Sequence, residues 1–224
     1  MILEHEEILI ILFTFLAVGL AILVAFKFLE SPGMPGSITP YPVELPAEPI
    51  SRDAQKLAQV MEHCKNHPVG DRRCNCGERC QEYANYILQY SGQYGIPDPL
   101  LVLSIIMQES SCNSEAVSPD GNDCGIMQVN VRTWSKEFEG LTCDALKDPK
   151  VGIEKGIWIL AYYYDYAIKH PETCKDRINL DNWQRAVWMY NTGPGCVMQV
   201  KNYLNQVMER YAKLKEIYES LTIT

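Results

Sequence analysis

Apolar residues recur at helical spacing through most of the chain after residue 50, and long runs that alternate between apolar and polar residues are lacking. Steps of three and four residues between apolar positions are typical of an amphipathic helix, whereas strict alternation is typical of a strand. This pattern predicts helices near residues 52–65, 78–92, 98–109, 130–138, 149–170, 181–190 and 196–220. Only the stretch CGIMQVN, which ends at Asn130, is suited to a short hairpin. We therefore expect a mainly α domain with at most a small β-hairpin.

Two of these helices have well-marked starts. Asp98 and Asp148 are each followed by proline, so an N-cap aspartate precedes a proline at the first helical position. The helix after Asp98 reads LLVLSIIM over residues 100–107, which is apolar on nearly every face and predicts a position in the core. Glu109 follows at the C-terminal end of this helix, where the chain enters a polar loop.

The last predicted helix carries apolar residues at alternating steps of three and four. They are Val197, Val200, Leu204, Val207, Tyr211, Leu214, Tyr218 and Leu221. Such spacing suits either a coiled-coil seam, through which the chain would self-associate, or a helix docked along its own core. We favour docking. The tyrosines of YYYDY, residues 162–166, are likewise expected to pack in the core, with some of them lining a groove.

The N-terminal part of the chain has a different composition. Residues 8–26 are uncharged and apolar, which predicts one transmembrane helix. The start MILEHEE lacks the basic residues of a cleaved export signal, so an uncleaved anchor is expected. The predicted organisation is an anchor over 1–30, a proline-rich linker over 31–50, a cysteine-rich helical part over 51–96 and a main functional region over 97–224.

Nine cysteines lie after the predicted anchor, a density that favours disulfides and an oxidising compartment. An odd number leaves at least one of them unpaired within the chain. Cys112 and Cys124 are placed to clamp the loop between them. A zinc site is the alternative for the tight group made by Cys64, Cys74, Cys76 and Cys80, with His63 and His67 nearby. The C-x-C-x3-C spacing is not a usual zinc pattern, so we favour disulfides and expect no metal.

Charge and cysteine content bear on partners and location. The net charge of −8 argues against nucleic acid, because phosphate binding needs clustered lysine and arginine. Lys27, directly after the apolar run, favours a cytoplasmic head by the positive-inside rule. The cysteines favour an extracytoplasmic head, and we give them more weight.

Glu109 is the first candidate for chemistry. Burial and the negative end of the helix dipole should both raise its pKa, as a general acid at neutral pH requires. The alternative is a glutamate that caps the helix or forms a surface salt bridge.

Three motifs favour the catalytic interpretation of Glu109 over the structural one. ESSCNSEAVSPDGNDCGIMQV, starting at Glu109, resembles the opening motif of the soluble lytic transglycosylases, which runs Glu-Ser, Ala-Val-Ser-Pro and Gly-Leu-Met-Gln. DPKVGIEKGIWILAYYYDY looks like the middle helix of that family, and MYNTGPGCV looks like its Tyr-Asn-Ala-Gly-Pro-Gly turn. The motifs occur in the family's order and extend over nearly half of the chain.

The resemblance implies a lysozyme-like, mainly helical fold and cleavage of the β-1,4 bond between N-acetylmuramic acid and N-acetylglucosamine in peptidoglycan. It implies that Glu109 is the sole catalytic acid and base and that the product is a 1,6-anhydro sugar, with no cofactor. Met127 is implied to form part of the wall. The implied substrate-binding residues are Ser118, Gln128, Tyr190 and Asn191. A wall substrate also supports an extracytoplasmic head on a membrane anchor.

One loop departs from the family pattern. SPDGNDCG, which starts at Ser118, is about one residue longer than expected and carries Asp120 and Asp123. Its GNDCGIMQVN also resembles goose-type lysozymes, which hydrolyse their substrate. If either aspartate reached the cleft, it could act as the base of an inverting hydrolysis. The alternative, which we favour, is ordinary turn chemistry.

The sequence thus leaves three functions to compare. The leading one is a membrane-anchored lytic transglycosylase. The second is a muramidase or chitinase that hydrolyses peptidoglycan or a related N-acetylhexosamine glycan. The third is a non-catalytic cell-wall-binding or assembly protein, against which the retention of Glu109, Tyr190 and Asn191 argues.

Overall fold

The structure is a computed structural model that describes residues 51–174, 180–196 and 201–221. Within these residues, none of the helices is long and apolar enough to cross a bilayer. The predicted anchor and linker lie outside the described residues, so both stay predictions.

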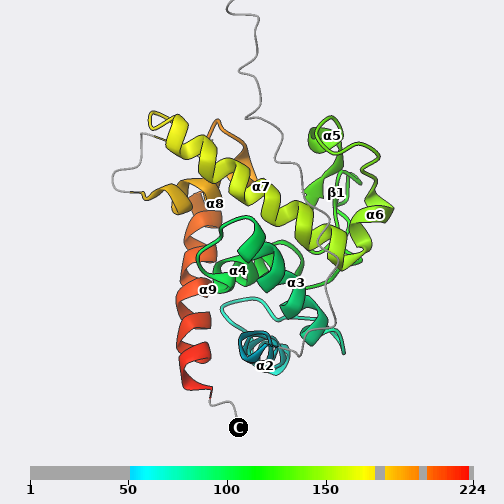
Figure 1. Ribbon diagram of the computed structural model, residues 1–224, viewed down its shortest axis with the longest axis vertical. Coiled ribbons are helices and arrows are strands. Elements are labelled where there is room, and N and C mark those ends of the chain that lie inside the picture. The colour runs from blue at the N-terminus through cyan, green and yellow to red at the C-terminus, as the bar shows by residue number, and fades with distance from the viewer. Residues whose placement is uncertain (1–50, 175–179, 197–200, 222–224) are drawn as a thin grey trace, which may run out of the picture. The chain divides into compact units, whose positions relative to one another are not determined.

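The described residues form a mainly helical domain with one very small sheet, as expected (Figure 1). The helices are α2 (Arg52–Asn66), α3 (Cys80–Gln93), α4 (Pro99–Ser110), α5 (Val131–Trp134), α6 (Cys143–Lys147), α7 (Pro149–Lys169), α8 (Asn182–Thr192) and α9 (Lys201–Ser220). Strands β1 (Asp123–Cys124) and β2 (Val129–Asn130) pair antiparallel, with Asp123 opposite Asn130. The hairpin lies in the stretch CGIMQVN that the sequence singled out, except that it begins one residue earlier, at Asp123.

The capping residues act as predicted. The side chain of Asp98 accepts a hydrogen bond from the backbone N–H of Leu100, and that of Asp148 accepts one from Lys150. In each case proline follows the cap and starts the helix. These local contacts fix where α4 and α7 begin.

Two elements differ from the prediction. The helix expected over 130–138 ends at Trp134, and hydrogen-bonded turns follow, among them one from the Leu141 N–H to the Phe138 carbonyl. Gly140 adopts a positive φ of 73° in this segment, which ends any continuing helix. The five-residue helix α6 was not predicted, because so short an element shows no periodicity; the Thr142 side chain caps it.

Helix α4 forms the centre of the core. Every side chain from Leu100 to Met107 is buried, as the uniformly apolar sequence predicted. Helices α3 and α9 pack against α4, and α7 packs against α3, α6 and α8 (Figure 1). Because both neighbours hold α4 in place, its C-terminal end is a firmly positioned point in the domain.

The apolar face of α9 is used inside the molecule. Leu204, Val207 and Leu214 are buried, and α9 packs along α4. This favours the docked helix over a coiled-coil seam. Val197 and Val200 lie outside the described residues, and self-association stays a prediction.

Four disulfides join cysteines of the described residues. They are Cys74–Cys112, Cys76–Cys80, Cys124–Cys143 and Cys174–Cys196. The expected clamp between Cys112 and Cys124 is therefore wrong, because each bonds to a cysteine of another segment. Cys64 is free and buried, and burial raises the pKa of its thiol to about 12.

Candidate active site

The C-terminal end of α4 is fixed from two sides. Ser111 and Cys112 both adopt a positive φ, which ends the helix, and Cys112 is bonded to Cys74. The Ser110 hydroxyl donates a hydrogen bond of 2.6 Å to the carbonyl of Ile126 in the Gly-Ile-Met-Gln segment. Glu109 is thus carried by a helix end that is attached both to the cysteine-rich part and to the hairpin.

A cleft of about 440 Å³ opens at this point. Residues of α4, the hairpin, α5, α7 and α8 contribute to its walls. They are Glu109, Asp123, Gln128, Val129, Asn130, Thr133, Trp134, Ile159, Tyr163, Tyr190, Asn191, Thr192 and Gly193. Five of the seven residues proposed from the sequence for binding or catalysis are thereby brought together, namely Glu109, Asp123, Gln128, Tyr190 and Asn191.

The carboxyl group of Glu109 is partly exposed in the cleft but is otherwise surrounded by protein. Its pKa is raised from the ordinary 4.5 to about 7, chiefly by this burial and further by the charge of Asp123. A hydrogen bond from Tyr203 and the charge of Arg72 act in the opposite direction. The expected rise in pKa is therefore present, and the carboxyl group exchanges its proton near neutral pH.

Tyr203 was missed by the sequence analysis. Its hydroxyl donates a hydrogen bond to Glu109 Oε1 from α9, 94 residues away along the chain. Burial and the neighbouring carboxylate raise the pKa of Tyr203 well above its ordinary value, so its proton stays available for donation. Nothing in the sequence near Tyr203 signals this contact, which arises because α9 packs on α4.

Polar residues near Glu109 attach the middle of α9 to the C-terminal end of α4 and to the segment that follows α2. Arg210 is only 3% exposed and donates to Gln108 Oε1 at 2.9 Å, to Asp71 Oδ1 at 3.0 Å and to the Val69 carbonyl. Gln108 also donates to Gln206 of α9 at 3.2 Å. These bonds attach α9 directly beside Glu109 and thereby support the Tyr203 contact.

Tyr190 and Asn191 lie in the cleft wall at the end of α8. The Tyr190 hydroxyl donates a hydrogen bond of 2.8 Å to the carbonyl of Met127, so it ties α8 to the Gly-Ile-Met-Gln segment. Asn191 is exposed and lines the cleft. Asn191 is thus the more accessible of the two to a ligand.

Gln128 and Ser118 are both engaged by their own loop. Gln128 adopts a φ of 48° and donates from Nε2 to the carbonyls of Ala116 and Gly125, at 3.0 and 2.9 Å, while lining the cleft. Ser118 accepts from the Asp123 N–H at 2.9 Å and does not belong to the cleft wall. The binding role of Ser118 stays a prediction.

The two aspartates of the long loop have different surroundings. Asp120 is exposed and away from the cleft wall, and hydrogen bonds from Ser118 and Asn122 lower its pKa to about 2. This is the turn chemistry that we favoured. Asp123 does line the cleft, where its Oδ1 accepts a hydrogen bond of 2.7 Å from Asn130. Of the two aspartates, Asp123 is the one that lies in the same cleft as Glu109.

Close packing behind the cleft explains two glycines. A Cβ on Gly156 of α7 would lie 2.6 Å from the Cβ of Met127, and one on Gly125 would lie 2.1 Å from the carbonyl oxygen of Leu146. Gly125 also adopts a φ of 76°. Met127 itself is fully buried, so it supports the wall from behind, in keeping with its expected structural role.

Aromatic residues of the cleft were only partly anticipated. Tyr163 lines the cleft, so one of the YYYDY tyrosines does face a groove, although it is only 6% exposed. Trp134, which also lines the cleft, was not singled out, because it is the last residue of the four-residue helix α5 and belongs to no recognisable motif.

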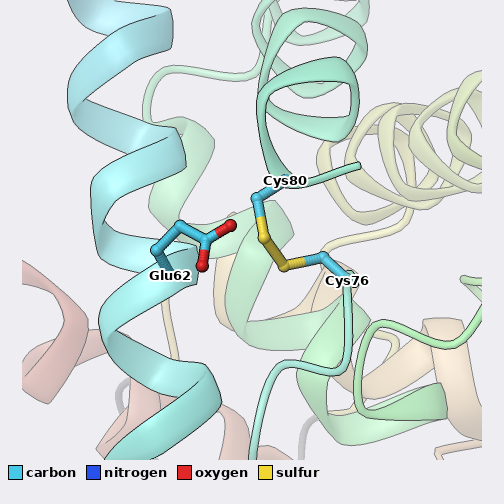
Figure 2. A group of neighbouring side chains, drawn as sticks. All are labelled: Glu62, Cys76 and Cys80. Carbon is cyan, nitrogen blue, oxygen red and sulfur yellow. A yellow bond between two sulfur atoms is a disulfide. The ribbon is translucent and has the colours of Figure 1, made fainter. Parts of the chain in front are cut away.

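A zinc site was the alternative to disulfides in the cysteine group. Among the described residues, Glu62, Cys76 and Cys80 bring three potential ligand atoms within 4.8 Å of one another. Figure 2 shows that the two sulfur atoms are bonded to each other and that Glu62 faces this bond from α2. Because the two sulfur atoms form a disulfide, they are not thiolates that could bind a metal. Glu62, Cys76 and Cys80 are also not among the residues that line the cleft. The disulfide interpretation of Cys74, Cys76 and Cys80 is thus confirmed.

A family model matches the chain. The model of the transglycosylase SLT domain covers residues 85–213, which is more than half of the chain. The match begins within α3 and ends within α9, so it includes Glu109, the hairpin, the cleft-lining part of α8 and Tyr203. The goose-type resemblance of the loop is not tested by this match. The chain therefore belongs to the transglycosylase SLT domain family, the glycan-cleaving lytic transglycosylases of peptidoglycan.

Proposed function

We propose that this protein cleaves the β-1,4 bond between N-acetylmuramic acid and N-acetylglucosamine and leaves a 1,6-anhydro end, with Glu109 as the acid and the base. The observation that carries the proposal is the carboxyl group of Glu109, which lies in the cleft with a pKa of about 7. A group with this pKa is present in both protonation states at neutral pH, as a residue with two successive roles requires.

In the first step, protonated Glu109 donates its proton to the glycosidic oxygen. The bond between that oxygen and C1 of the muramic acid breaks, and its electron pair goes to the leaving sugar. The positive charge that develops at C1 is stabilised by the 2-acetamido oxygen of the substrate itself. A second protein carboxylate is thus not needed for this step, in contrast to the usual pair in glycosidases.

In the second step, the Glu109 carboxylate removes the proton of the substrate's 6-hydroxyl group. The freed oxygen forms a bond to C1 and closes the anhydro ring, which restores protonated Glu109 without consuming water. Tyr203 donates to the carboxylate form and therefore stabilises Glu109 between the two steps. In this proposal Gln128 and Asn191 hold the sugars from the cleft wall.

Hydrolysis is the second candidate, because Asp123 lines the same cleft as Glu109. With water bound between the two carboxyl groups, Asp123 would be the base of an inverting reaction. Asp120 is a poor base for this reaction, since it is away from the cleft wall and its pKa is about 2.

Digestion of purified peptidoglycan, followed by mass analysis of the products, separates the two candidates. Anhydro products, lighter by one water than reducing ones, support the proposal, whereas reducing ends overturn it in favour of hydrolysis. Asp123→Asn should still yield anhydro products, and Asp120→Asn is its matched control in the same loop. Glu109→Gln should abolish product release, and full activity of that variant would refute the role of Glu109.

We further propose that the catalytic domain lies outside the cytoplasmic membrane on an N-terminal anchor. Support comes from the apolar run over residues 8–26 and from the disulfides, which persist in oxidising compartments. Protease added to intact cells should degrade the domain, and complete protection in cells whose envelope is permeable to the protease would contradict this location.

A further inference from the structure

A row of aromatic rings follows one side of α7. Trp158, Tyr162 and Tyr166 are spaced four residues apart, and each step advances about 6 Å along a helix. The ring centroids of Trp158 and Tyr162 are 5.6 Å apart with planes 10° from parallel, and those of Tyr162 and Tyr166 are 6.5 Å apart. His170 extends the row, with its ring 4.2 Å from that of Tyr166. We call Trp158, Tyr162, Tyr166 and His170 the aromatic row.

The aromatic row begins at the cleft. Trp134, which lines the cleft, meets the ring of Trp158 at 5.9 Å and 82° and the ring of Tyr162 at 5.5 Å and 84°. From there the row proceeds toward the C-terminal end of α7. This end of α7 lies away from α6 (Figure 1). One end of the row is thus continuous with the binding site already described.

The aromatic row is not the core face of α7. The core face consists of fully buried residues such as Ile153, Ile157 and Leu160, whereas all four members of the row are partly exposed. Trp158, Tyr162 and Tyr166 also pack against the core, but only with part of their surface. The row therefore leaves aromatic surface in contact with solvent at the edge of the cleft.

The substrate is longer than the cleft. A cavity of about 440 Å³ is of the size that holds a small ligand, within the usual range of roughly 300–1,000 Å³. A glycan strand is a polymer, so it must continue past the cleft wall in both directions. Sugar rings have apolar faces of C–H groups and polar edges, which suits tyrosine rings that present an apolar body with a polar hydroxyl.

We propose that the aromatic row is an additional binding site for the N-acetylhexosamine strand, which stacks on Tyr162 and Tyr166 as it leaves the cleft past Trp134. The inference rests on the proposed function, because it takes the cleft to be the place where the strand is cut. It adds a preference for long strands over short ones, since a short oligosaccharide fills the cleft without reaching Tyr166.

The test compares Tyr166→Ala with the unaltered full chain on long glycan strands stripped of peptides and on a tetrasaccharide of the same sugars. Loss of one stacked ring should raise the KM for long strands roughly two- to tenfold. The KM and kcat for the tetrasaccharide should stay the same. Tyr166→Phe retains the ring and should retain the KM, whereas Tyr166→Leu, which keeps apolar volume without a ring, should behave as Tyr166→Ala.

Tyr164→Ala is the matched control, because Tyr164 lies on the same helix but stacks on Trp183 at 3.9 Å, away from the row. Its KM for long strands should be unchanged. Equal losses of Tyr166→Ala on both substrates, or no loss on either, would overturn the proposal.

A second measurement keeps this inference separate from the proposed function. Sedimentation with insoluble glycan strands measures binding without turnover, and the Tyr166 variants should bind more weakly than the unaltered chain there as well. If the unaltered chain released no product, the proposed function would fail while this binding difference still tested the aromatic row. Equal binding by all variants would refute the row as a binding site.

Discussion

Replacing Glu109 by glutamine should stabilise the protein in a pH-dependent way while abolishing its activity. The fold keeps the carboxyl group largely out of water, which costs free energy when the group is charged. Glutamine has nearly the same shape, remains neutral, and its side-chain oxygen can still accept the hydrogen bond from Tyr203.

The magnitude follows from the two pKa values. Raising the pKa from 4.5 to about 7 corresponds to about 3 kcal/mol of free energy of unfolding. Between these values the folded state keeps a proton that the unfolded chain releases, so the stability contributed by Glu109 falls as pH rises through this window. Glu109→Gln and the unaltered protein should therefore be equally stable near pH 4 and should differ by up to about 3 kcal/mol above pH 7.

Urea unfolding of the oxidised protein at a series of pH values measures this difference directly. Glu115→Gln is the control, because Glu115 is an exposed glutamate in the loop that follows α4. Its unfolding free energy should run parallel to that of the unaltered protein. Parallel curves for Glu109→Gln as well would refute the idea that burial sets the pKa of Glu109.

Three further outcomes are expected. The hydrogen bond from Tyr203 lowers the pKa of Glu109, so Tyr203→Phe should move the alkaline limb of the pH profile of kcat/KM to higher pH. An unmoved limb would show that this hydrogen bond does not affect the catalytic protonation of Glu109. Gly156→Ala should destabilise the protein by about 1–3 kcal/mol and lower its activity, because the new Cβ would lie 2.6 Å from the Cβ of Met127. An unchanged midpoint of thermal unfolding would contradict this close packing. Cys112→Ser removes the disulfide to Cys74, which has a sequence separation of 38, and should lower the free energy of unfolding in denaturant by about 4 kcal/mol. Reductant should then lower the free energy of unfolding of the variant by less than that of the unaltered protein.

The sequence by itself determined the local structure. Asp98 and Asp148 cap their helices by bonding to backbone groups two residues away, and such contacts depend on neighbouring residues alone. The apolar run over residues 100–107 had to be buried in any compact fold, and Glu109 therefore had to emerge at the edge of a core. The elevated pKa of Glu109 followed from that burial.

The tertiary structure decided which distant residues meet Glu109. Tyr203 reaches it across 94 residues because α9 docks on α4, and no pattern near either residue specifies that contact. Cys112 pairs with Cys74 rather than Cys124 for a similar reason, since pairing requires two segments to be brought together. Asp123 turns into the cleft and Asp120 does not, because the hairpin fixes Asp123 opposite Asn130 while Asp120 bonds within its own turn. Helix caps and apolar periodicity act within about one helical turn, whereas the surroundings of a reactive group depend on how separate helices pack.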